Sequence, residues 1–154
     1  MKDGQYGHGN HWIVELNSEV AGITSAWHAD LAPSFHQATL QSIVNYYGAI
    51  DALEVVQRCK ILNELIPPPA DDGWCIGHFA VSKAFQGQGI GKMLLEHMRT
   101  LAIQNGKVRL TLDVELNNKN AIQFYQHWGF NSSSINTTAN SNDNNYTHMY
   151  RLLF

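Results

Sequence analysis

The chain has 154 residues, of which 44% are hydrophobic and 15% are charged, and its formal net charge is −3 at pH 7. A chain of this length can bury its own core, so we expect residues 1–154 to form one domain. The weakly acidic balance gives no basic footprint for nucleic acid, and no apolar run approaches the roughly 20 residues that cross a bilayer.

Targeting and redox signals are also few in this sequence. The first residues lack the apolar segment of a signal peptide. The two cysteines, Cys59 and Cys75, lie in apolar surroundings and do not make a disulfide framework. We therefore expect both to be reduced core residues of a cytoplasmic enzyme or binding domain.

The beginning of the chain predicts a loop and then a β-hairpin. Residues 1–10 are rich in glycine, histidine and asparagine, which is typical of a loop. A strand with period-two alternation begins near His11, and the turn at 17–19 leads into a second strand over 20–27. These two strands are close enough in sequence to pair as an antiparallel hairpin.

A helical pattern follows the hairpin. Apolar residues recur at helical spacing over 36–65, and Gly48 is expected to divide the segment into two helices. Ser34 is a candidate cap at its start, and the prolines at 67–69 end it. We expect this segment to shape substrate access or a dimer contact, or else to add to the core.

The most informative stretch is residues 74–92. An apolar strand that ends at Val81 enters a polar turn, and the alternate glycines Gly87, Gly89 and Gly91 lead into a helix. Glycines let the backbone approach a ligand closely, and the first N–H groups of a helix are unpaired at the positive end of its dipole. This arrangement is typical of an anion cradle, most often for phosphate.

Two common phosphate-binding motifs do not fit this spacing. A Walker P-loop needs a glycine where Gln86 stands and a serine or threonine where Met93 stands. A dinucleotide-binding loop needs a third glycine at the position of Lys92. The pattern that remains is a glutamine followed by two glycines directly after a strand.

The second half of the chain predicts a strand between two helices. Apolar periodicity indicates a helix over 90–105, and strict alternation indicates a strand over 108–114 with one buried face. Asn117 or Asn118 caps a further helix that ends before Gly129. If the strands before and after the first helix are parallel, their connection is expected to be right-handed.

The end of the chain contains a polar tract. Residues 131–147 are mostly serine, threonine and asparagine, and we interpret them as a mobile hairpin connection. Residues 148–154 predict a final strand that completes the sheet.

Two sequence blocks, separated by one predicted helix and one predicted strand, together resemble the GNAT superfamily of acetyl-CoA-dependent N-acyltransferases. The family signature is Gln/Arg-x-x-Gly-x-Gly/Ala after a strand, and a later Asn-x-x-Ala-hydrophobic-x-x-Tyr-x-x-x-Gly-Phe pattern closes the cofactor site. The resemblance covers residues 74–130 closely and the flanks loosely. In this chain the blocks read Gln86-x-x-Gly89-x-Gly91 and Asn118-x-x-Ala121-Ile122-x-Phe124-Tyr125-x-x-x-Gly129-Phe130.

The resemblance implies an α/β fold, of the α+β kind with a mixed sheet. Its central parallel strands, which are the fourth and fifth of the family, splay apart and open a cleft. The hairpin looks like the family's second and third strands, and the helices over 36–65 are an insertion before the fourth. A first strand and two helices usually precede this hairpin, and residues 1–10 are too few for them. We expect that this portion is missing or that another subunit of a homodimer replaces the acceptor-site wall that it forms.

The resemblance also implies a site for acetyl-CoA. The pantetheine arm would lie in the cleft against the backbone of Phe79 and Val81, as an added strand does. The pyrophosphate would sit on the N–H groups of 86–92. Lys92 could instead be a solvated helix residue, and Asn118 a plain N-cap. The implied cofactor-binding set is Phe79, Val81, Gln86, Gly87, Gln88, Gly89, Ile90, Gly91, Lys92, Asn118 and Tyr125.

Tyr125 matches the family's general acid, which protonates the leaving thiolate, although a tyrosine among aromatic residues could also be core. An ordinary tyrosine pKa near 10 makes that proton transfer nearly balanced. The general base is less clear. In the family it is often a carboxylate or histidine on the fourth strand, where the aligned positions are Cys75 and Gly77. His78 is one candidate, but strand alternation points it away from the face of Cys75 and Gly77 unless a bulge re-aims it. Cys75 is not expected to be a nucleophile, and the scattered histidines predict no metal site.

Together these features predict an N-acetyltransferase that moves an acetyl group from acetyl-CoA to a primary amine by direct attack on the thioester. An alternative is a catalytically degenerate GNAT domain that binds acyl-CoA as a sensor or assembly module. A nucleotide-binding domain of another kind is a third hypothesis. The acceptor, a small molecule or a peptide, is not specified by the sequence.

Overall fold

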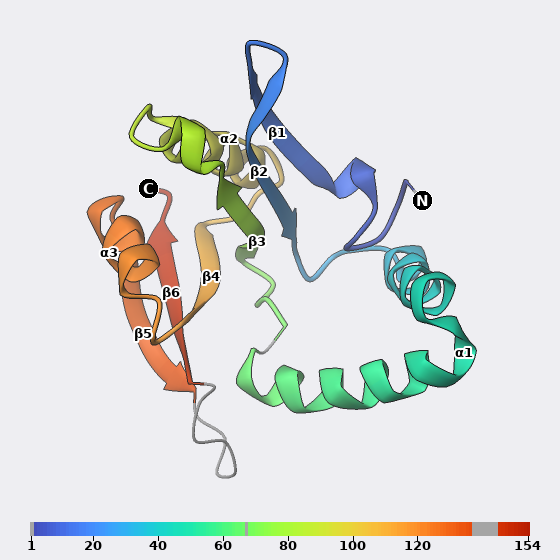
Figure 1. Cartoon of the computed structure of the whole chain (residues 1–154). Helices are drawn as coiled ribbons and strands as arrows, with labels where there is room; N and C mark the ends of the chain where they lie inside the picture. Colours follow the sequence, from blue (N-terminus) through green and yellow to red (C-terminus); the bar gives the residue numbers. More distant parts are fainter. Residues whose placement is uncertain (1, 67, 137–144) are drawn as a thin grey trace.

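The computed structural model describes residues 2–66, 68–136 and 145–154, without the side chains of 60–65, 134 and 136. Within these ranges one mixed sheet of six strands has the order β1-β2-β3-β4-β6-β5 (Figure 1). No helix in the described part of the chain is both long and apolar enough to cross a membrane. The strands are β1 His11–Leu16, β2 Glu19–Trp27, β3 Gly73–Val81, β4 Arg109–Glu115, β5 Asn131–Asn136 and β6 Tyr146–Leu152; the helices are α1 Pro33–Leu65, α2 Ile90–Gln104 and α3 Lys119–His127, with short 3-10 turns η1 His8–Asn10 and η2 Lys83–Phe85.

The central pair of strands, β3 and β4, is parallel, and every other neighbouring pair is antiparallel. The pairing of β3 with β4 covers only residues 73–75 and 109–111. Both strands continue beyond these residues, to Val81 and to Glu115. The two strands are therefore paired only at their beginnings and splay apart beyond them, which confirms the predicted architecture.

One face of the sheet is covered by α2 and α3. The apolar positions of the central strands alternate, so one face gathers the side chains that pack on these helices. Leu95, Met98 and Ala102 of α2 are fully buried there. The same core cluster contains Trp74, Ile76, Leu110, Leu112, Val114, Tyr125, Phe130, Met149 and Leu153.

The end of α2 and the start of α3 both lie where the sequence predicts them. Gly106 has φ 70°, and the N–H groups of Gly106 and Lys107 bond to the carbonyls of Ile103 and Ala102, which closes the end of α2. The N-cap of α3 is Asn118, whose side-chain oxygen accepts from the N–H of Ala121 at 3.1 Å. The cap thus falls on the second of the two predicted asparagines.

The helical insertion α1 starts earlier than its sequence pattern indicates. Pro33 is its first residue, so Ser34 lies inside the helix and the predicted Ser34 cap is wrong. A proline has a fixed φ that suits the first helical position and lacks an N–H that would be unpaired there. Gly48, with φ 81° and ψ 163°, breaks α1 into two halves, as predicted.

The apolar side of α1 does not join the core. Ala52 is buried, but Leu40, Ile50 and Leu53 are all at least 49% exposed. Figure 1 shows α1 apart from α2 and α3, below the sheet in that view. The interpretation of this segment as extra core is therefore wrong, because helical periodicity identifies an apolar side without identifying what covers it. Cys59 is likewise only half-buried on α1.

The polar tract before the last strand is partly a strand itself. Residues 131–136 form β5, which pairs with β6 at the edge of the sheet. The prediction of a connection over 131–147 is therefore wrong for 131–136, because backbone pairing with β6 does not require apolar side chains. Residues 137–144 lie outside the described residues. Strand β6 begins at Tyr146, slightly before its predicted start.

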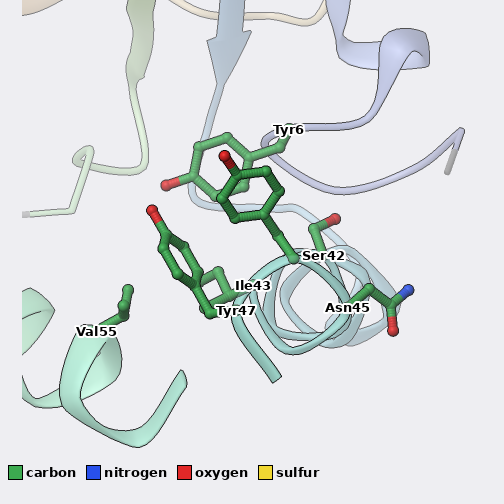
Figure 2. Close-up of a pocket in the computed structure, with 7 residues that line it drawn as sticks. Tyr6, Ser42, Ile43, Asn45, Tyr47 and Val55 are labelled. Carbon is green, nitrogen blue, oxygen red and sulfur yellow. The ribbon is translucent and has the colours of Figure 1, made fainter. Parts of the chain in front are cut away.

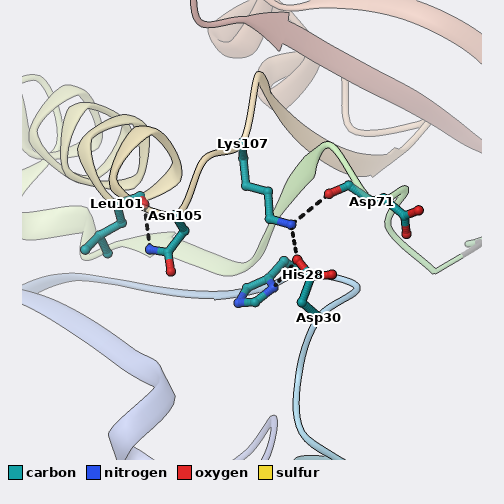
Figure 3. A network of polar contacts seen from close by, with 6 residues as sticks. All are labelled: His28, Asp30, Asp71, Leu101, Asn105 and Lys107. Atoms are coloured by element: carbon teal, nitrogen blue, oxygen red, sulfur yellow. Dashed lines mark hydrogen bonds and ion pairs between the residues drawn. The ribbon is translucent and has the colours of Figure 1, made fainter.

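Two ion pairs hold the paired end of β3 and β4. The ammonium of Lys107, which is 4% exposed, bonds to the carboxylate of Asp30 and to the carbonyl oxygen of Asp71 at 2.7 Å (Figure 3). Arg109 donates to both carboxylate oxygens of Asp72, at 2.7 and 2.6 Å from one nitrogen. Because these contacts join the loops before α1 and β3 to the start of β4, they fix the end from which the strands diverge.

Candidate functional site

The glycine-rich loop after β3 needs two of its glycines for backbone conformation. Gly87 has φ 77° and Gly89 has φ 81°, and no atom lies within 4 Å of where a Cβ would stand at either position. Gly89 is the N-cap of α2, and its carbonyl accepts the N–H of Met93 at 3.0 Å. The preceding N–H groups, those of Ile90, Gly91 and Lys92, come before the first helical hydrogen bond and have no acceptor within the helix.

The third glycine has a packing role. A Cβ on Gly91 would lie 2.8 Å from Cζ of Phe124, so only glycine lets α3 approach α2 this closely. The Phe124 ring in turn lies 5.3 Å from that of Tyr125, measured between centroids. Gly91 therefore couples the position of the loop to the position of α3.

Three polar side chains of the loop have partners within the protein. Gln86 donates to the carbonyl of Val81 at 3.4 Å, and Gln88 donates to the carbonyl of Ala84 at 3.3 Å. The ammonium of Lys92 lies 5.4 Å from the centroid of the Trp128 ring, a cation–π distance. These contacts order the loop without using the first N–H groups of α2.

A cleft of about 210 Å³ lies between the diverging strands and α3. It brings together Phe79, Asn118 and Tyr125 of the predicted site, and also His78. Val81 and residues 86–92 are not in its wall; they follow at the end of β3. The wall consists of Ile76, Gly77, His78 and Phe79 of β3, Leu112, Asp113, Val114 and Glu115 of β4, and Asn118, Ala121 and Tyr125.

Tyr125 is a buried phenol in an aromatic environment. It is 7% exposed, and its ring lies 5.9 Å from Phe79 and 5.5 Å from Phe130. Burial raises the pKa of Tyr125 to about 12, so the phenol is protonated throughout the neutral range. Proton transfer from it to a thiolate is therefore less balanced than an ordinary tyrosine pKa predicts.

A β-bulge directs His78 to the face opposite the core. The register between β2 and β3 shifts between Ile23, opposite Ala80, and Ser25, opposite Gly77. His78 itself has φ 46°, which is unusual for a residue with a side chain. The Ser25 hydroxyl is 3.0 Å from Nδ1 of His78. The bulge thus meets the condition under which His78 is a candidate base.

Aromatic rings surround the His78 imidazole. Its centroid is 5.7 Å from that of Tyr6 and 5.6 Å from that of His11, both stacked, and Trp27 approaches edge-on at 6.1 Å. Partial burial, followed by the charge of His11, lowers the pKa of His78. The imidazole is therefore neutral at pH 7 and able to accept a proton.

Asp113 in the cleft wall is paired with His148, which lies outside that wall. They face each other across β4 and β6, with 2.9 Å between Asp113 Oδ1 and His148 Nδ1. The Asp113 side chain is only 5% exposed and lines the cleft. Sequence reasoning missed this pair because Asp113 fits the outward side of an alternating strand. The one local signal was a carboxylate between two buried apolar residues of the strand beside the implied cleft.

Cys75 does not have the properties of a nucleophile. It is 6% exposed, and burial together with the charge of Asp113 raises the pKa of its thiol to about 12. Its sulfur is therefore an un-ionised thiol near neutral pH. Over the described ranges, no three His, Cys, Asp or Glu side chains gather as a possible metal-ligand group.

Comparison with known sequences identifies the class of protein. The sequence profile of the Acetyltransferase (GNAT) family matches residues 3–130, and the chain therefore belongs to this family. The predicted family is thus confirmed.

Two bacterial relatives are similar to part of this chain. The [ribosomal protein bS18]-alanine N-acetyltransferase of Escherichia coli K12 is 38% identical over 82 residues, which is 53% of this chain and 55% of that protein. The protein of the same name from Salmonella typhimurium is 41% identical over 58 residues, 38% of this chain and 39% of that protein. The chain spans about half the length of the curated relatives that it matches.

Solved structures share the fold at low sequence identity. Ard1 from Thermoplasma volcanium superposes with a TM-score of 0.62 at 16% identity, covering 94% of this chain and 71% of that one. The ribosomal-protein-S18-alanine N-acetyltransferase from Escherichia coli gives a TM-score of 0.56 at 18% identity, covering 93% and 68%. The mixed α/β architecture is therefore that of GNAT acetyltransferases.

Proposed function

We propose that this protein transfers an acetyl group from acetyl-CoA to a primary amine by direct attack on the thioester. One observation carries the proposal: the wall of the cleft between the splayed strands contains a buried, protonated phenol, that of Tyr125, and a buried carboxylate, that of Asp113, which pairs with His148. A module that only binds acyl-CoA needs the cleft but neither of these groups.

The residues present fit acetyl-CoA. Beyond Cys75 and Thr111 the facing backbone edges of β3 and β4 are unpaired, and an extended arm can bond to such edges. The open space at Gly87 and Gly89 lets a pyrophosphate reach the first N–H groups of α2. The Asn118 side-chain oxygen caps α3, which leaves its amide nitrogen to donate to the arm.

Each titratable group has a role that its environment supports. Acetyl-CoA supplies the acetyl carbonyl that the amine nitrogen attacks, and the C–S bond breaks as the new C–N bond forms. Asp113, held by His148, accepts the proton that the amine loses. Tyr125 gives its proton to the departing sulfur. His78, neutral at pH 7, is a second candidate for the base.

We propose a peptide amino terminus as the acceptor. The relatives that match this chain are named as alanine N-acetyltransferases of ribosomal protein bS18. A free α-amino group has a pKa of about 7.7–8.0, so a larger fraction of it is neutral near pH 7 than of a lysine amine, whose pKa is about 10.4.

Ligand binding and turnover test the proposal separately. Acetyl-CoA should raise the melting temperature, because a hundredfold excess over Kd adds about 2.7 kcal/mol to the free energy of unfolding. ATP and NAD should not raise it. Thiol release should follow when an alanyl peptide is added. Tyr125→Phe should keep the thermal shift and lose about 10²–10⁴-fold in kcat.

Other outcomes would reject the proposal in distinguishable ways. Stabilisation by acetyl-CoA without thiol release from any amine would favour the sensor or assembly alternative. Stabilisation by ATP or NAD, without an effect of acetyl-CoA, would favour a nucleotide-binding domain of another kind.

A further inference from the structure

We propose that a second cavity, formed by the N-terminal segment and α1, binds an apolar or aromatic side chain of a peptide acceptor, next to its terminal residue. This inference rests on the proposed function. The cavity has a volume of about 610 Å³, within the usual range of ligand sites. Its lining residues are Tyr6, Ser42, Ile43, Asn45, Tyr46, Tyr47 and Val55 (Figure 2).

The cavity adjoins the cleft through a pair of stacked rings. Tyr6 lines the cavity, and its ring stacks on His78 with 5.7 Å between centroids. His78 in turn lines the cleft between β3 and β4. A peptide whose amino group lies in the cleft can therefore reach the cavity by passing over these two rings.

The lining selects an uncharged, apolar group. No charged side chain is among the seven lining residues, so a cationic or anionic ligand would lose hydration without gaining a partner. Three tyrosines supply aromatic surface, and Tyr46 and Tyr47 lie edge to face at 4.7 Å. Rings of this kind pack well against aromatic and aliphatic side chains.

Two tyrosine hydroxyls, rather than the other polar groups of the lining, suit a peptide backbone. The Ser42 hydroxyl already donates to the carbonyl of Ala38 at 3.0 Å, and the Asn45 oxygen already accepts from Gln41 at 2.7 Å. The hydroxyls of Tyr6 and Tyr47 point toward the same side of the cavity, away from Ser42 and Asn45 (Figure 2). They can therefore bond to peptide groups that flank a buried side chain.

Local contacts hold the cavity walls in place. The N–H of Gln5 donates to the Thr39 hydroxyl at 2.9 Å, which attaches the N-terminal segment to α1. Gly4 lies so close to α1 that a Cβ there would be 2.7 Å from the Thr39 nitrogen. The break at Gly48 turns the second half of α1, so Val55 faces the tyrosines of the first half. The cavity is thus formed before any ligand binds.

Two tripeptide amides test this assignment: alanyl-phenylalanyl-glycinamide and alanyl-glycyl-glycinamide. The protein should prefer the phenylalanyl peptide by about tenfold or more in kcat/KM, mainly through KM. Val55→Trp, which fills the cavity, should bring the ratio toward one. Leu53→Trp is the matched control, since Leu53 is on the same half of α1, 66% exposed and outside the lining, and should keep the preference.

Calorimetry with the N-acetylated forms of both peptides tests the cavity without turnover. The acetylated phenylalanyl peptide should bind about tenfold more tightly, and Val55→Trp should remove the difference. Equal affinity for both would overturn the inference, whether or not the enzyme acetylates amines. Acetylation of both peptides at equal rates would overturn it while leaving the proposed function intact. A dimer that Val55→Trp converts to a monomer would assign the cavity to a second copy of the chain.

Discussion

The two faces of the sheet bury different chemistry with the same strands. On the face toward α2 and α3 the buried side chains are mostly apolar, with the uncharged Thr147 among them, whereas neighbouring residues on the opposite face are polar or titratable although they too are largely buried. Strand alternation produces this division, because each polar residue is adjacent in sequence to a core residue. The pairs are Ser25 beside Ala26, Cys75 beside Ile76, Asp113 beside Leu112 and Val114, and His148 beside Met149.

The difference teaches that mutations can separate stability from the proposed chemistry. Along one strand, a substitution on the apolar face should affect mainly stability, and one at the next residue should affect mainly the proposed reaction. His78 belongs to the polar face only because a bulge interrupts the alternation. The cleft is where the two faces meet, since Tyr125 reaches it from the apolar side and Asp113 from the polar side.

The largest effect is expected at Asp113. Asp113→Asn removes the proposed proton acceptor and should lower kcat by about 10²–10⁴-fold, because an amide cannot take a proton. Steady-state thiol release measures the loss of kcat, and a urea melt of the same preparation measures the free energy of unfolding. His148→Gln, which keeps the carboxylate but changes its partner, should lose less activity. An unchanged kcat in Asp113→Asn would show that the polar face does not supply the base.

The apolar face should respond in the opposite way. Leu95→Ala removes a fully buried side chain of α2 and should lower the free energy of unfolding by about 2–5 kcal/mol. Met93→Ala, on the same helix but 54% exposed, should change it by only about 0.5 kcal/mol. Urea denaturation measures both. A loss in Leu95→Ala no greater than in Met93→Ala would contradict the assignment of the core to this face.

The two ends of α2 offer a matched pair of glycines. Gly89→Ala and Gly106→Ala each place a side chain at positive φ, in open space, and should each cost about 1–2 kcal/mol of stability. Only Gly89→Ala should also weaken acetyl-CoA binding, because only Gly89 is in the loop beside the cleft. Calorimetric titration with acetyl-CoA distinguishes them. Equal weakening in both variants would indicate a loss of folding rather than of a cradle.

The smallest effect is expected on folding stability when the pH is lowered. Burial lowers the pKa of His78 and of His28 in the folded state below the ordinary value of 6.5. The unfolded chain therefore binds these protons more readily, and stability should fall as the pH drops below 6.5 and through the folded-state pKa. His78→Gln, which retains a group able to bond to Ser25, should flatten this fall. Melting curves between pH 7.5 and about 5 measure it; an identical slope in the variant would contradict the shift at His78.

The sequence predicted the parts of the candidate site whose local structure depends on neighbours in the chain. The glycine loop and the Asn118 cap follow from short patterns whose backbone requirements are local, whereas the splayed strands were expected only from the resemblance to the family. Tyr125 was placed by the same block, although its raised pKa depends on aromatic residues that fold around it.

What the sequence could not predict depends on contacts between distant residues. Asp113 and His148 are 35 positions apart, and their pairing is set by the register of β4 with β6 across a polar tract. The bulge that turns His78 arises from the register between β2 and β3. The exposed side of α1 and the strand β5 likewise required knowledge of what lies beside each segment.

The short pairing of β3 with β4 has a mechanical consequence. Only residues 73–75 and 109–111 join the two strands, and the ion pairs of Lys107 and Arg109 hold that same end. Along the rest of β3, amides that point to β2 are protected from water, whereas those that point to β4 face the cleft. Hydrogen exchange in this strand should therefore alternate between slow and fast amides, and a bound acyl donor should slow only the fast ones.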